Sequence, residues 1–110
     1  AGREAIPICL RQEVKEGPVQ ILTTISGTEP ALYDAVIEKV SLGDHTPTKN
    51  LILRITDPEL LSKTGGIVQG MSGSPILQDG KLAGAVTHVF VNDPTRGYGI
   101  FAENMLDAAR

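Results

Sequence analysis

The run from Gly70 to Pro75, which reads GMSGSP, has the residue types and spacing of a serine nucleophile on a tight turn. A serine hydroxyl attacks a carbonyl carbon only when a base removes its proton and backbone N–H groups wait where the oxyanion forms. We expect Ser72 to be the nucleophile and the N–H groups of Gly70 and Ser72 to form the oxyanion hole. A glycine two residues before the serine permits the backbone twist that brings these groups together.

The residues after the serine separate two classes of serine hydrolase. The nucleophile elbow of α/β-hydrolases reads G-x-S-x-G and is followed by a helix. Here Ser74 replaces the last glycine, and Pro75 leads into segment 76–86, which reads as two apolar strands joined by an Asp-Gly turn. This is the chymotrypsin-like arrangement, whose pattern is G-D-S-G-G-P, although Met71 replaces the acid. The alternative is an ordinary loop, since Gly- and Ser-rich turns between strands are common.

The elements that must position this turn are almost all strands. Short apolar and β-branched runs alternate with turn residues, which predicts strands at 19–25, 33–40, 51–56, within 76–86 and at 98–102. One helical turn is expected between Asp57 as N-cap and Gly65 as C-terminal stop, and a terminal helix at 103–110. The predicted fold class is mainly β, a six- to seven-stranded antiparallel barrel of the chymotrypsin-like second-barrel type with a short C-terminal helix.

Length and composition limit the function classes. A chain of 110 residues is one domain and small for a complete two-barrel protease, so half an enzyme is expected. The net charge of −3, with dispersed charges, leaves no basic face for nucleic acid and no polybasic membrane patch. The single Cys9 excludes an internal disulfide and a cysteine-based metal site, and we expect it to be a small buried hydrophobe. We expect no cofactor and no metal.

Three long stretches, 55–58, 64–76 and 84–100, closely resemble the stage IV sporulation protein B peptidases of endospore-forming Firmicutes. Weaker similarity at 4–8 and 13–15 extends the resemblance over essentially the whole chain. It implies a serine endopeptidase of the chymotrypsin-like clan. Residues 1–110 would be the C-terminal half, or second barrel, of the peptidase domain, with the upstream half and a PDZ domain absent.

The resemblance also implies a place in the cell. The family is made in the forespore and exported into the space between the forespore and mother-cell membranes. Its members cleave themselves and activate the mother-cell sigma-factor checkpoint, by cutting a membrane protein that restrains an intramembrane metalloprotease.

Two catalytic residues carry over from the family. Ser72 matches the nucleophile, and Asp57 matches the acid of the triad. As a sequence feature Asp57 is also a good helix cap, and both interpretations stay open. The family histidine lies in an upstream Gly-His motif that no position here matches, so we expect the isolated chain to be inactive.

The two histidines present are assigned other roles. His88 follows the nucleophile on the strand that lines the primary specificity pocket in chymotrypsin-like enzymes. We therefore predict that Thr87, His88 and Val89 bind substrate. His45 lies in the polar loop 43–46 and reads as a solvated loop residue.

Two function classes remain. The first is a serine endopeptidase half whose partners are a peptide or protein substrate and the upstream half of its own peptidase domain. The alternative is a non-catalytic β-barrel module that holds a peptide as an added strand near 87–89. An exposed inter-barrel face also suggests a homodimer.

Overall fold

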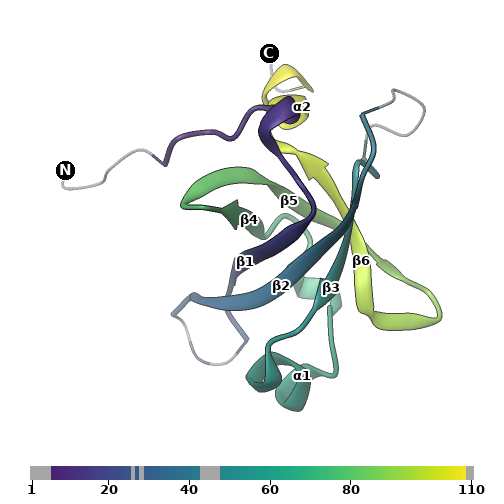
Figure 1. Cartoon of the computed structure of the whole chain (residues 1–110). Coiled ribbons are helices and arrows are strands. Elements are labelled where there is room, and N and C mark those ends of the chain that lie inside the picture. Colours follow the sequence, from purple (N-terminus) through teal and green to yellow (C-terminus); the bar gives the residue numbers. More distant parts are fainter. Residues whose placement is uncertain (1–5, 26, 28, 43–47, 109–110) are drawn as a thin grey trace.

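A computed structural model describes residues 6–25, 27, 29–42 and 48–108. Six strands form a closed barrel in the order β1-β2-β3-β6-β5-β4, and every neighbouring pair is antiparallel (Figure 1). This confirms the predicted mainly β barrel with a short C-terminal helix. The strands are β1 (Gly17–Thr23), β2 (Ala31–Val40), β3 (Leu51–Ile55), β4 (Pro75–Gln78), β5 (Lys81–Phe90) and β6 (Asp93–Phe101).

Two short α-helices and two 3-10 turns complete the described part of the chain. Helix α1 (Pro58–Thr64) and helix α2 (Ala102–Ala108) lie at opposite ends of the barrel (Figure 1). The 3-10 turns are η1 (Arg11–Glu13) and η2 (Gln69–Met71). The predicted helical turn is confirmed in detail, with Pro58 at its start and Gly65 ending it in the left-handed conformation at φ 74°.

Alternation along the strands fills the barrel interior. Every second residue is buried along β3 and, from Val19 onward, along β1. The fully buried side chains include Ile21, Leu53, Ile76 and Phe101. Burial of each such side chain contributes roughly 1.5–3 kcal/mol relative to leaving it in water. Cys9 is free and buried, as predicted, and burial raises the pKa of its thiol.

The β4–β5 hairpin has the predicted turn. Asp79 and Gly80 adopt φ of 52° and 78°, the two left-handed positions of a type I′ turn. The predicted last strand, 98–102, was too short, because β6 begins at Asp93. A proline and a glycine weaken the strand pattern there, and pairing with β3 and with the distal half of β5 makes the strand.

The pairing of β5 with β6 requires a glycine at position 84. A Cβ built on Gly84 would lie 1.9 Å from the Ile100 carbonyl oxygen. We expect Gly84→Ala to lower the free energy of unfolding by about 3 kcal/mol or more, because neither backbone can move away without breaking the ladder. Urea unfolding measures this. Gly70→Ala adds its methyl group to open space and serves as the control; equal midpoints for the two variants would contradict this register.

Candidate active site

Ser72 stands on a turn that is hydrogen-bonded directly to β5. It follows η2 with an extended backbone, φ −59° and ψ 132°. The N–H of Gly73 donates to the Val86 carbonyl at 2.7 Å, and the N–H of Val86 donates to the Ser74 carbonyl at 3.0 Å. These two bonds fix the serine beside the point where β4 stops pairing with β5.

The residues on either side of Ser72 anchor the turn in the core. Met71 is 1% exposed, and Ser74, which is also buried, donates from its hydroxyl to Thr23 Oγ1 of β1 at 3.1 Å. Ser72 itself is exposed. Met71 stands where the G-D-S-G-G-P pattern has an acid, and Ser74 stands where it has a glycine. These departures have a local explanation, because both side chains anchor the turn in the barrel core.

The backbone N–H groups around Ser72 differ in whether they are paired. Met71 N–H donates to the Val68 carbonyl at 2.9 Å, and the N–H groups of Gly73 and Ser74 are also bonded. Within the described part of the chain, the N–H groups of Gly70 and Ser72 donate to no carbonyl. These are the two groups assigned to the oxyanion hole. The backbone conformation that favours glycine lies at Gly73, with φ 87°, and not at Gly70, which belongs to the 3-10 turn η2.

A bulge in β5 turns a carbonyl toward the serine. The register against β6 shifts between Val86 and His88, which leaves Thr87 without a partner on that side. The Thr87 carbonyl accepts the Ser72 hydroxyl at 3.2 Å. A carbonyl orients this hydroxyl but is too weak a base to remove its proton. The hydroxyl therefore has its partner in Thr87 and not in the His88 side chain, and His45 lies outside the described residues.

Beyond the bulge, one edge of β5 is open. The β4 register ends at the pair Pro75 and Ala85, and among the described residues no strand pairs with this edge after Ala85. Strand alternation places the backbone groups of Val89 on the same side as the Thr87 carbonyl. An extended peptide has room to add here as an antiparallel strand.

The serine opens onto a cavity of about 350 Å³. Its lining residues are Ile67, Val68, Ser72, Thr87, His88 and Val89. The three predicted substrate-binding residues and the predicted nucleophile are thus brought together. Ile67 and Val68 were not predicted. The sequence shows an apolar pair shortly before the nucleophile turn, but it does not show that this pair lines a cavity.

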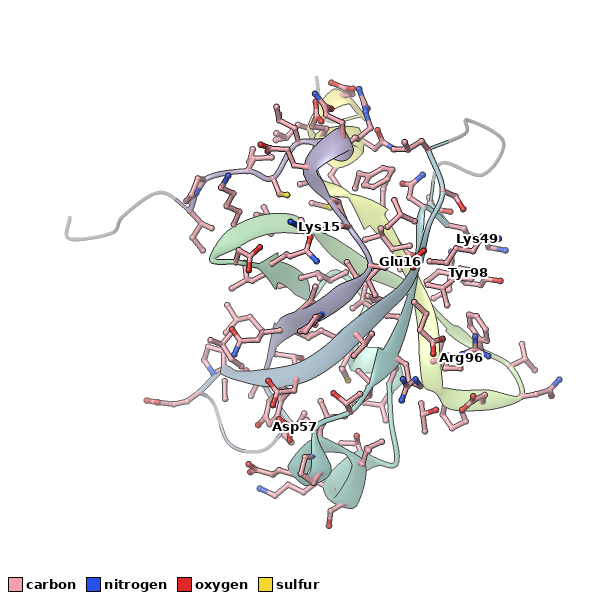
Figure 2. All side chains as sticks on the ribbon, in the orientation of Figure 1. Lys15, Glu16, Lys49, Asp57, Arg96 and Tyr98 are labelled. Atoms are coloured by element: carbon pink, nitrogen blue, oxygen red, sulfur yellow. The ribbon has the colours of Figure 1, made fainter. Side chains whose placement is uncertain are left out.

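Asp57 lies elsewhere, at the start of α1 (Figure 2). Its Oδ1 accepts the N–H groups of Glu59 at 2.9 Å and Leu60 at 3.3 Å, and its Oδ2 accepts the N–H of Asp34 in β2 at 3.0 Å. The Asp34 N–H, followed by those of Leu60 and Glu59, holds the pKa of Asp57 below its ordinary value. The helix-cap interpretation is confirmed, and the same carboxylate ties α1 to the barrel.

A second, larger cavity of about 650 Å³ shares His88 and Val89 with the first. Its wall carries the rings of Phe90 and Tyr98, which pack against each other in a tilted arrangement with centroids 4.8 Å apart. Lys49 lies over the Tyr98 ring, and Arg96 lies over the Phe90 ring; Figure 2 shows Lys49, Tyr98 and Arg96 on one side of the barrel. The surface next to the serine cavity is therefore aromatic and cationic.

Among the described residues, no cluster of three or more His, Cys, Asp or Glu side chains has the arrangement of a metal site. The helices of the described ranges are all too short or too polar to cross a membrane.

A protein-family model described as SpoIVB peptidase S55 matches residues 1–106. The chain belongs to this family. This confirms the resemblance that the sequence motifs indicated, and it supports a peptidase. No curated protein and no solved structure matches this SpoIVB peptidase chain.

The hydrogen bonds of Asp57 make stability depend on pH. Because its pKa is lowered in the fold, the ionised carboxylate stabilises the protein above its unfolded pKa of about 3.9, and this contribution is lost as the pH falls through the lower folded value. We expect Asp57→Ala to cost about 1–2 kcal/mol at pH 7, and less below about pH 4. Urea unfolding at a series of pH values measures the difference; a deficit that stays constant down to pH 2 would contradict it.

Proposed function

We propose that this SpoIVB peptidase chain is the nucleophile-bearing half of a serine endopeptidase, with Ser72 as the nucleophile. The observation that carries the proposal is the position of its hydroxyl. It is exposed at a largely apolar cavity. Among the described residues, the strand edge next to it pairs with no further strand, and the two N–H groups beside it donate to no carbonyl. An ordinary loop serine has no reason to combine these three features.

In the proposed reaction, the open edge, the Ser72 hydroxyl and the two N–H groups each have one role. A substrate peptide adds along the open edge of β5, which brings its scissile carbonyl to Ser72. The Ser72 oxygen attacks the carbonyl carbon while its proton passes to a base, and the N–H groups of Gly70 and Ser72 stabilise the oxyanion. The proton then goes to the leaving amine, and water releases the acyl group.

The base comes from outside these residues. We propose that the upstream half of the peptidase domain supplies the histidine, so that the chain alone is inactive. Asp57 is proposed as the triad acid in addition to its capping role. Its Oδ2 accepts one N–H and has a further lone pair for a histidine N–H.

The finer biology follows from the family. We propose that the parent protein is exported from the forespore into the space between the two membranes, cleaves itself there, and activates the mother-cell sigma-factor processing checkpoint. The partners are its membrane-protein substrate and its own upstream half.

Labelling with a fluorophosphonate probe tests the nucleophile. In the full-length protein we expect the probe to modify Ser72, and Ser72→Ala to abolish both labelling and self-cleavage. The exposed Ser62 of α1 offers a matched control, since Ser62→Ala should change neither. The 110-residue chain alone should label at least about 100-fold more slowly, because it lacks the base.

Peptide binding without any labelling of the full-length protein would instead favour the non-catalytic peptide-binding barrel. Isothermal titration with an extended peptide distinguishes the two classes.

A separate variant tests Asp57. Asparagine is as good an N-cap as aspartate, so Asp57→Asn retains much of the fold. If Asp57 orients the histidine, labelling of Ser72 should fall by about 10³- to 10⁴-fold at a temperature where the variant is folded. A change of less than about threefold would assign Asp57 to the helix cap alone.

A further inference from the structure

One of the side chains that line the cavity beside Ser72 is almost fully buried. Ile67 is only 4% exposed although it lines the cavity. Its Cδ1 lies 2.7 Å from the position that a Cβ on Gly97 would occupy, so the Ile67 side chain rests directly on the backbone of β6. Ile67 therefore fills the space between the nucleophile turn and β6.

The backbone holds Ile67 in this position. Its N–H donates to the Pro94 carbonyl at 2.7 Å. The preceding Gly66 packs so closely that a Cβ there would lie 2.2 Å from the same carbonyl oxygen. The floor of the cavity is thus attached to β6 at two successive residues, and it cannot withdraw to admit a longer side chain without breaking these contacts.

Among the described residues, no Asp, Glu, Lys or Arg lines the cavity, and Val68 and Val89 form apolar walls. A charged substrate side chain would lose its hydration here without gaining an oppositely charged partner from these residues. An aromatic side chain inserted toward β6 would meet the buried Ile67 side chain.

We propose that this cavity is the primary specificity pocket and that it accepts a short aliphatic side chain, of the size of alanine or valine, with Ile67 as the residue that limits its depth. The proposal rests on the proposed function of Ser72. It adds the substrate class, namely peptides with a small apolar residue immediately before the scissile bond.

Peptidyl diphenyl phosphonates test the preference directly. Four probes share one peptide sequence and differ only in the residue next to phosphorus, which is an analogue of valine, leucine, phenylalanine or lysine. Mass spectrometry of the full-length protein follows the rate of Ser72 modification. We expect the valine probe to react at least about tenfold faster than the phenylalanine and lysine probes.

Two isoleucine variants identify the residue responsible. Ile67→Val removes the methyl group that rests on Gly97, and we expect it to raise the leucine-to-valine rate ratio by about fourfold to tenfold. Ile76→Val is the matched control, because Ile76 Cδ1 similarly approaches Gly99 but lies outside the cavity. The control should leave the ratio unchanged, and thermal melting verifies that both variants are folded.

The outcomes separate this inference from the proposed function. If a simple fluorophosphonate does not label Ser72, the proposed function fails. If Ser72 is labelled but reacts equally with all four probes, or fastest with the phenylalanine or lysine probe, the pocket inference is overturned and the nucleophile stands. An unchanged ratio in Ile67→Val would remove Ile67 as the limiting residue.

Discussion

The two hydrogen bonds between the serine turn and Val86 are the interaction on which the site depends. They continue the β4–β5 ladder by one step beyond the last paired residues, Pro75 and Ala85. Beyond that step, no described strand pairs with this edge of β5, while its other edge stays paired with β6. These two bonds therefore fix the position of Ser72 along β5, and the open edge of β5 begins beside it.

The bulge at Thr87 follows from this arrangement. Without a register shift, the Thr87 carbonyl would face β6. The open edge would then carry the backbone N–H and carbonyl groups of the residues next to Thr87. The shift aims the Thr87 carbonyl at Ser72, while the His88 carbonyl lies within 2.5 Å of the place where a Cβ on Gly97 would stand. The close approach of β6 at Gly97 and Gly99 accommodates the displaced backbone, since any side chain there would meet it.

Much of this fold could be predicted from the sequence, because it depends on local signals. The Asp-Gly turn, the Asp57 cap and the β-branched runs each specify an element within a few residues. The start of β6 could not be predicted, because residues 93–97 contain a proline and a glycine and become a strand only by pairing with β3 and β5. The candidate site also combines a part that local sequence signals predict and a part that depends on remote contacts. The serine turn is a local motif, whereas Ile67 enters the cavity only through contacts with Pro94 and Gly97, which are remote in sequence.

The contact between Ser72 and Thr87 connects substrate binding with reactivity in the proposed mechanism. In the described structure the hydroxyl proton is held by the Thr87 carbonyl. A peptide that adds to the open edge brings its own N–H toward the same carbonyl, because that carbonyl is the first acceptor the edge presents. The amide N–H and the Ser72 hydroxyl then compete for one oxygen. A carbonyl that pairs with the substrate leaves the hydroxyl free to turn toward a base, so binding and activation of the nucleophile are coupled through Thr87.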